Sequence, residues 1–200
     1  MSDEKIDARA AQAAATRAKL IGAAAALFSE QGLTKPSLDA ICERAGYTRG
    51  AFYVHFDNRD DLIGAVIEQV MGGFIEAIIA AGEAGADLAM IVRTFTQAVE
   101  TGAFPFPSSV RSHQVLEACA RSEPLRAKYV ELLERARARL KDTVRRGQEA
   151  GTIRRDTDPD AVAQLLLATV LGVEVASELS VPYDAGGVGE LVLAMLAPTS

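Results

Sequence analysis

The feature that most constrains this chain is a joint between two short helix-forming segments that meet at Gly46. Ser37 precedes the first segment and Thr48 the second, and hydroxyl side chains in such positions accept hydrogen bonds from the free N–H groups of a helix start. Gly46 can adopt the positive φ that a tight turn requires. The small Cys42 lies four residues earlier, where the two helix backbones would approach each other. The pattern predicts two helices packed at a steep angle through a short turn.

Helical periodicity extends along nearly the whole chain, and no convincing alternating strand pattern is present, so the predicted fold class is all-α. The first ~15 residues are polar and rich in alanine, which suggests a frayed arm. We interpret Asp184–Gly187 as a turn. The predicted helices are Thr16–Gln31, Leu38–Ala45, Thr48–His55, Asn58–Ala81, Asp87–Thr101, Val110–Ala120, Pro124–Ala150, Asp158–Ser180 and Val188–Ala197.

The charge is unevenly distributed along the chain. The net charge of −6 argues at first against a nucleic-acid partner. Residues 16–59, however, hold six Lys or Arg against four acids, a balance of +2, whereas residues 61–200 hold 13 against 19, a balance of −6. A mildly basic N-terminal region on an acidic remainder is compatible with a protein that contacts DNA with one end.

The second helix of the joint is short and polar at its start, as expected of a helix that enters the major groove of DNA. Its exposed residues would be Thr48, Arg49, Gly50, Tyr53 and His55. Apolar contacts between the two helices would come from Ile41, Ala45, Tyr47 and Phe52.

From Thr16 to Val70 the sequence resembles the N-terminal domain of the TetR family of bacterial transcriptional regulators. The Phe-Tyr-x-His-Phe core at 52–56, followed by a capped helix, is far more specific than a bare helix-turn-helix. The matching residues are Ala24, Leu27, Phe28, Gly32, Ser37, Ile41, Ala45, Gly46, Gly50, Phe52, Tyr53, His55, Phe56, Asn58, Arg59, Asp61 and Leu62. The resemblance implies a DNA-binding domain at 14–74, with its helix-turn-helix at 37–56, and a ligand-binding and dimerisation domain at 75–200.

The resemblance also implies which residues contact DNA. Thr48 and Tyr53 would contact phosphates or thymine methyl groups, and Arg49 and Gly50 would approach base edges. The remaining DNA-contacting residues would bind phosphate groups. Ser37 would place the N-terminus of its helix on a phosphate, and His55 and Arg59 would bind phosphates of the DNA backbone.

These roles have simpler alternatives. Arg49 could be a solvated surface charge, Tyr53 a core residue and His55 a helix cap. The sequence departs from the family pattern at Cys42, Tyr47 and Asp57, where alanine, a smaller aliphatic residue and proline are usual, and the charge of Asp57 would lie near the proposed phosphate contacts.

The predicted helix Asp158–Ser180 is apolar nearly all round. A helix of this kind must be covered on every side. The core of a chain of this size can cover one face of the helix, so we expect a second subunit to cover the other face. The alternative is a fully central helix in a monomer. The residues predicted for the dimer interface are Leu165, Leu167, Leu171, Val175 and Leu191.

Aromatic and aliphatic residues near a proline-rich loop fit the effector cavity that the resemblance implies, although each could equally be a core residue. The predicted effector-binding residues are Phe95, Phe104, Phe106, His113, Leu116, Tyr129, Leu133 and Glu174. The expected partners are therefore operator DNA, a second copy of the chain and a small hydrophobic ligand.

Other functions find little support in the sequence. It has no Ser/His/Asp set, P-loop or glycine-rich dinucleotide turn, so we expect no enzymatic activity and no cofactor. His113 and Glu117 could be two metal ligands, but we predict no metal site, because only one other histidine exists. Cys119 could be a redox switch, and Cys42 reads as a packing residue. A regulator that has lost its inducer, acting as a partner-binding protein or constitutive DNA organiser, is a further alternative.

The sequence also bears on localisation. No uninterrupted apolar run reaches the length of a membrane span, and we see no export signal at the N-terminus. Two cysteines are too few for a disulfide framework, as expected in a reducing compartment. We therefore expect a cytoplasmic protein without a membrane partner, associated with the nucleoid when it is bound to DNA.

Overall fold

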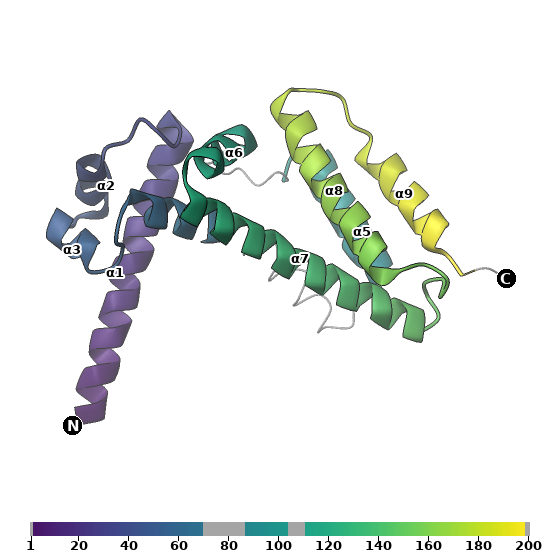
Figure 1. Cartoon of the computed structure of the whole chain (residues 1–200), viewed down its shortest axis with the longest axis horizontal. Coiled ribbons are helices and arrows are strands. Elements are labelled where there is room, and N and C mark those ends of the chain that lie inside the picture. The colour runs from purple at the N-terminus through teal and green to yellow at the C-terminus, as the bar shows by residue number, and fades with distance from the viewer. Residues whose placement is uncertain (1, 70–86, 104–110, 199–200) are drawn as a thin grey trace. The chain divides into compact units, whose positions relative to one another are not determined.

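The computed structural model describes residues 2–69, 87–103 and 111–198, and the regular elements within these ranges are all helices (Figure 1). The predicted all-α fold class is confirmed. Contacts divide the chain into two compact units. The N-terminal unit comprises Met1–Gln69 and Ser108–Tyr129, and the C-terminal unit comprises Val70–Pro107 and Val130–Ser200. The domain boundary predicted between residues 74 and 75 lies outside the described residues.

The N-terminal unit has its own apolar core. Its elements are α1 (Ser2–Gln31), α2 (Leu38–Ala45), α3 (Arg49–Tyr53), a helical segment at 59–69, α6 (Ser112–Arg121) and the start of α7 (Glu123–Glu149). Large side chains that are at most 1% exposed form this core: Leu20, Phe28, Ile41, Phe52, Phe56, Leu62 and Val66. The segment 62–67 is buried at every residue, so side chains cover it on all sides.

Helix α1 is longer than the sequence patterns predict. It begins at Ser2, whereas the apolar pattern starts at Thr16, and the expected frayed arm is helical instead. Residues 7–15 are exposed, so tertiary packing does not explain the extension. Alanine has the highest intrinsic helix propensity, and an alanine-rich segment can extend a helix that is already nucleated.

The C-terminal unit contains α5 (Leu88–Glu100), the remainder of α7, α8 (Pro159–Glu178) and α9 (Ala185–Leu196). Helices α5 and α9 pack together because Gly189 lacks a side chain: a Cβ there would lie 2.6 Å from the Cγ2 atom of Thr96. An ion pair at 3.0 Å between Arg93 and Glu190 joins the same two helices. The buried core of the unit comprises Leu88, Val92, Val144, Ile153, Val162, Val192 and Leu196.

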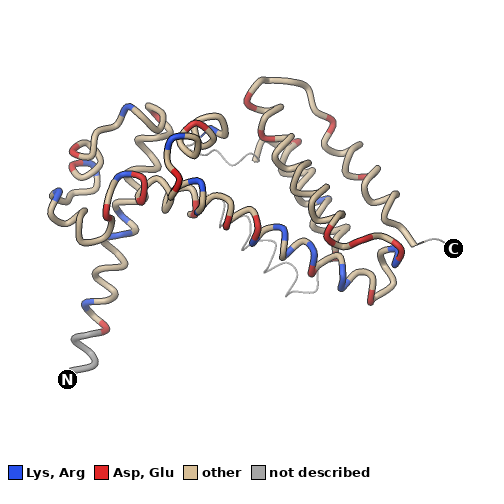
Figure 2. The backbone as a smooth tube through the Cα atoms, in the orientation of Figure 1, with Lys and Arg blue, Asp and Glu red and all other residues tan. Residues whose placement is uncertain are grey.

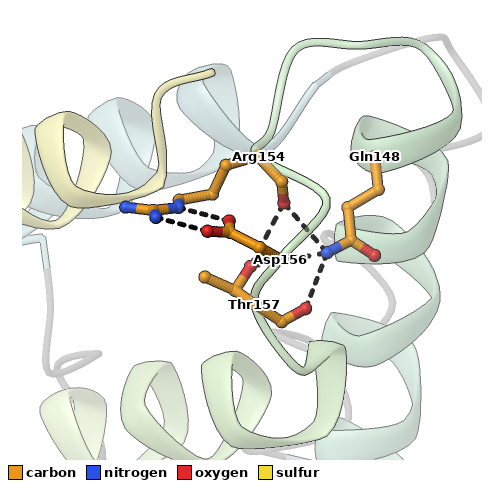
Figure 3. A network of polar contacts seen from close by, with 4 residues as sticks. All are labelled: Gln148, Arg154, Asp156 and Thr157. Atoms are coloured by element: carbon orange, nitrogen blue, oxygen red, sulfur yellow. Dashed lines mark hydrogen bonds and ion pairs between the residues drawn. The ribbon is translucent and has the colours of Figure 1, made fainter. Parts of the chain in front are cut away.

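A polar network fixes the connection between α7 and α8 (Figure 3). The side-chain amide of Gln148 donates to the backbone carbonyls of Arg154, at 3.0 Å, and Thr157, at 2.8 Å. Arg154 forms two 2.6 Å hydrogen bonds with Asp156, and its backbone N–H donates to the carbonyl of Leu196 at the end of α9. The loop is thereby attached to both α7 and α9.

The start of α9 differs from the prediction. Residues 185–187 were expected to form a turn, but α9 begins at Ala185. Asp184 caps the helix by accepting the N–H of Gly187 at 2.8 Å. This capping bond offsets the low helix propensity of the two glycines in the first turn.

Helices α8 and α9 expose apolar residues at regular helical spacing. Leu165 is 46% exposed, Val175 47% and Leu191 60%. We call the following exposed residues the α8–α9 set: Leu165, Ala168, Gly172 and Val175 on α8, Leu179 at its C-cap, and Leu191 and Met195 on α9. On α8 these positions recur every three or four residues, so they lie along one face of the helix.

By length and composition, α8 is the one helix of the described ranges that could cross a membrane, with a mean hydropathy of 1.5. Only 17% of its apolar window is buried within the chain. The helix nevertheless contributes Val162, Ala163 and Val173 to the buried interior. Its first turn carries Asp160, whose carboxylate pairs with Lys141 of α7 at 3.4 Å. These contacts are those of a core helix with one uncovered face.

Candidate nucleic-acid interface

The helix-turn-helix forms where the sequence predicts it. The Ser37 hydroxyl accepts the N–H of Ala40 at 3.1 Å, which caps α2. Gly46 ends the helix with a φ of 75° and donates its N–H to the carbonyl of Glu43 at 3.0 Å. The next N–H, of Tyr47, returns to the carbonyl of Cys42 at 2.9 Å. These bonds satisfy the last carbonyls of α2 and turn the chain into α3.

Helix α3 presents polar groups around one buried anchor. Phe52 is 0% exposed and stacks on Phe56 with ring centroids 5.3 Å apart. Its neighbour Tyr53 is 57% exposed. Thr48 caps the helix by accepting the N–H of Ala51 at 3.3 Å. The burial of Phe52 therefore fixes which face of α3 points outward.

Four of the predicted DNA-contacting residues lie together on this outward face: Thr48, Arg49, Gly50 and Tyr53. Gly50 has only the Thr48 hydroxyl near its missing Cβ, at 3.6 Å, so a ligand could approach the backbone there. His55 follows the end of α3 and is half-buried. Ser37, at the N-terminus of α2, is also exposed.

Arg49 forms an ion pair with Asp39 within the chain. Its Nε lies 2.7 Å from a carboxylate oxygen of Asp39 on α2, and both side chains are more than half exposed. Ion pairs of this kind contribute about 0–1 kcal/mol because water screens them. A base edge or a phosphate could therefore replace Asp39 at little cost.

Arg59 has partners inside the protein. Its guanidinium donates to the carbonyls of Leu33, at 2.5 Å, and Pro36, and it lies 5.8 Å from the ring centroid of Phe28. Burial lowers the pKa of this guanidinium, partly offset by Asp60, but an arginine stays charged. Arg59 thus joins the start of the 59–69 segment to the loop between α1 and α2. The phosphate contact predicted for it stays a prediction and would use its remaining N–H groups.

Contacts from α1 support the helix-turn-helix, and sequence reasoning missed them. Arg17 lies over the ring of Phe56 at 5.0 Å, and Lys19 over the ring of Tyr47 at 6.0 Å. The hydroxyls of Thr16 and Tyr47 are 3.4 Å apart. Tyr47, which departs from the usual family pattern, therefore fills space against α1. A basic residue near an aromatic one in the folded chain cannot be identified from sequence spacing alone.

Both signs of charge occur on the N-terminal unit (Figure 2). Arg44 on α2 binds Glu30 on α1 through two hydrogen bonds of 2.7 and 2.8 Å. Lys128 on α7 pairs with Asp61, and this contact is the main cause that lowers the pKa of the Asp61 carboxyl. Ion pairs thus neutralise some of the acidic groups, while the outward face of α3 carries no acidic residue of its own.

Burial raises the pKa of both the Cys42 and the Cys119 thiols. The thiolate is the reactive form, so a raised pKa reduces reactivity at neutral pH. Both cysteines are buried and unpaired by disulfides, which fits packing roles. In the described part of the chain, no group of three or more potential ligands could hold a metal ion.

The predicted effector residues occupy different environments. Phe104 and Phe106 lie outside the described residues. Phe95, Tyr129, Leu133 and Glu174 are half-buried, and His113 and Leu116 are exposed. They are divided between the two units, and the effector pocket stays a prediction. Of the residues predicted for the dimer interface, Leu165, Val175 and Leu191 are exposed, whereas Leu167 and Leu171 are half-buried.

Two family models match this chain. Residues 20–66 match the tetR family of bacterial regulatory proteins, and residues 112–184 match the tetracyclin repressor-like C-terminal domain. The HTH-type transcriptional regulator TtgR of Pseudomonas putida is 41% identical over 59 residues, which are 30% of this chain. The match spans only 28% of TtgR itself.

Solved structures extend the similarity to most of the chain. SmeT in complex with triclosan is 28% identical, covers 92% of each chain and has a TM-score of 0.70. A second structure of SmeT, described as the repressor of the Stenotrophomonas maltophilia multidrug efflux pump SmeDEF, has a TM-score of 0.62 and covers 90% of this chain and 87% of its own. With a family-specific N-terminal domain, a matching C-terminal domain and these structural relatives, the chain belongs to the tetR family of bacterial regulatory proteins.

Proposed function

We propose that this protein is a ligand-responsive transcriptional regulator, a repressor that binds a palindromic operator as a homodimer and releases it when a small apolar or amphipathic effector binds. The observation that carries the proposal is the outward face of α3, where Thr48, Arg49, Gly50 and Tyr53 surround the buried anchor Phe52. A short helix with a polar, basic start fits the major groove. We place the protein in the cytoplasm, associated with the nucleoid when it is bound to DNA.

The dimer is supported by the α8–α9 set. A run of exposed leucine, valine and methionine side chains on two helices is costly in water and marks an interaction surface. Ala168 and Gly172 lie between the larger residues and would let a partner helix approach closely. Leu165, Val175 and Leu191 are therefore better interface candidates than Leu167, which packs partly against the buried pair Leu140 and Ala163.

Repression and the binding of an apolar small molecule are supported by the relatives. SmeT is described as a repressor, and one of its structures holds triclosan. The half-buried Phe95 and Leu133, both of the C-terminal unit, would contribute apolar surface to such a ligand. The alternative of a constitutive DNA organiser predicts that no hydrophobic compound raises the melting temperature of the protein or lowers its affinity for DNA.

The direct test of DNA reading is selection of bound duplexes from a random library. We expect a two-fold-related consensus, with half-site centres about 34–36 Å apart or a multiple of that distance. The Arg49→Ala variant should lose about 1–3 kcal/mol on the consensus and discriminate less at one position per half-site. Failure to enrich any two-fold-related sequence would contradict the proposal.

A matched control separates base reading from general attraction to DNA. Arg44→Gln removes a basic residue from α2 that is held by Glu30 and lies off the outward face of α3. It should leave the base preference unchanged. If Arg49→Ala weakened binding to all sequences equally, Arg49 would be a phosphate contact and not a base reader.

A further inference from the structure

The backbone of Leu33, in the loop between α1 and α2, is held from two sides. Its N–H donates to the Oε1 atom of Gln114 on α6 at 3.2 Å. Its carbonyl accepts from the guanidinium of Arg59, at the start of the 59–69 segment, at 2.5 Å. Leu33 itself is 3% exposed, so an unpaired N–H or carbonyl there would lack a water partner. One buried residue thus links α6 to the 59–69 segment.

The contact between Gln114 and this loop depends on Gly32. A Cβ at Gly32 would lie 3.0 Å from the amide nitrogen of Gln114, and the φ of Gly32 is +81°. The glycine therefore ends α1 in a left-handed conformation and leaves space for the glutamine side chain. Helix α6 also buries Val115, Ala118 and Cys119. This packing fixes the position of the helix and therefore the position of Gln114 beside the loop.

The second arm of the Arg59 guanidinium reaches the helix-turn-helix. It donates to the carbonyl of Pro36, the residue directly before Ser37. Ser37 caps α2, and its carbonyl accepts the N–H of Ile41 at 3.1 Å, which is the first hydrogen bond of the helix. A rigid, planar guanidinium that binds two carbonyls fixes their relative position.

We propose that Gln114 is a positioning residue that links α6 to the start of α2 through Leu33 and Arg59, and thereby sets the orientation of the helix-turn-helix for operator binding. This inference rests on the proposed function. The proposed connection runs through the loop between α1 and α2. Side chains from α6 and from the 59–69 segment hold this loop and so fix the position of the N-cap of α2.

Three variants of α6 test the proposal in the full-length protein. Gln114→Leu keeps the size of the side chain and removes the acceptor for the N–H of Leu33, whereas Gln114→Glu keeps an acceptor oxygen. Glu117→Gln is the matched control, because it breaks an exposed ion pair with Arg121 on the same helix. On the operator recovered from library selection, we expect Gln114→Leu to bind about fivefold to tenfold more weakly, and the other two variants to bind within twofold of the wild type.

A double-mutant cycle with Arg59→Lys separates positioning from stability. Lysine offers a single ammonium in place of the planar fork, so it cannot hold both carbonyls in the same way. Since both changes act through Leu33, the double variant should lose little more operator affinity than the weaker-binding single variant. Losses that simply multiply would overturn the proposal. So would a cycle that shows coupling only in the free energy of unfolding, with operator affinity unchanged.

Amide hydrogen exchange provides a measurement that requires no DNA. In Gln114→Leu the N–H of Leu33 should exchange faster than in the wild type. The exchange rate of the Ile41 N–H, at the start of α2, should also rise, by about fivefold or more. Unchanged exchange at Ile41 would overturn the link even if the variant unfolded at a lower temperature. If the wild type enriched no operator, the proposed function would fail, while exchange at Ile41 would still decide whether Gln114 positions α2.

Discussion

The N-terminal unit and the α8–α9 pair differ in how completely they bury their apolar residues. In the N-terminal unit, Phe28, Phe52 and Phe56 are at most 1% exposed. On α8 and α9, Leu165 and Leu191 are 46% and 60% exposed. The first region completes its core within one chain, whereas the second leaves an apolar face uncovered. Under the proposed function, this difference implies that each chain forms its DNA-reading surface alone, and that only a second chain can cover the exposed face of α8 and α9.

The largest expected effect contrasts two neighbours on α3. Phe52→Ala removes the buried anchor of the N-terminal unit and should cost about 3–5 kcal/mol of stability, because the cavity cannot fill. Tyr53→Ala changes a residue that is 57% exposed and should alter stability by less than about 1 kcal/mol while weakening DNA binding. Denaturant unfolding and operator titration measure the two quantities. Equal loss of stability in both variants would show that the face assigned to α3 is wrong.

The second effect concerns the uncovered face. Leu191→Glu introduces a carboxylate on α9, where it would be buried without a partner in a dimer but solvated in a monomer. Sedimentation should show a mass of about 42 kDa for the wild type, twice the 21.2 kDa of the chain, and a shift toward the monomer in the variant. Ala138→Glu, a change at an exposed position on α7 of the same unit and outside the α8–α9 set, is the control and should remain dimeric. A dimer that tolerates Leu191→Glu would exclude this part of α9 from the interface.

The third effect compares two glycines of the N-terminal unit. A Cβ would meet nothing within 4 Å at either Gly22 or Gly46, so backbone conformation alone separates them. Gly46 has a φ of +75°, and Gly46→Ala should destabilise the unit by about 1–2 kcal/mol. Gly22 lies inside α1, and Gly22→Ala should stabilise it by about 0.5–1 kcal/mol. Thermal unfolding measures both, and opposite signs are the expected result.

The smallest effect is a pH dependence. Lys128 lowers the pKa of Asp61 below its ordinary value of 3.8, so the pair contributes stability above that value and loses it as the pH falls through the lowered pKa. The pair is partly exposed and is worth at most about 1 kcal/mol. Lys128→Met should therefore be slightly less stable than the wild type at neutral pH, and the difference should vanish in acid. Carbon NMR should show the pKa of Asp61 rising in the variant; no change would mean that the ion pair is absent in solution.

Local signals allowed much of the fold to be predicted from the sequence. Ser37, Gly46 and Thr48 each act through neighbours within a few residues, so α2, the turn and α3 follow from spacing. The N-cap Asp158 with Pro159 at the helix start marks the beginning of α8 in the same way. The extension of α1 to Ser2 was missed, because the apolar pattern stops where high helix propensity alone continues the helix.

Long-range contacts could not be predicted in this way. Leu33 and Gln114 are 81 positions apart, and Asp61 and Lys128 are 67 apart, so no periodicity connects them. Arg59 resembles a phosphate-binding residue by its place in the family motif, and only the folded chain shows its contacts with Leu33 and Pro36. Spacing can identify which residues share a helix face, but tertiary packing decides which of them meet.

The most direct test of the account is the stoichiometry and affinity of binding to one palindromic operator recovered from library selection. The wild type should bind with two chains per site, and Leu191→Glu should bind the full site no more tightly than a single half-site while keeping the same half-site base preference. That result would show that each N-terminal unit reads DNA alone and that α8 and α9 join two of them. A monomeric variant that binds the full palindrome as tightly as the wild type would contradict the account.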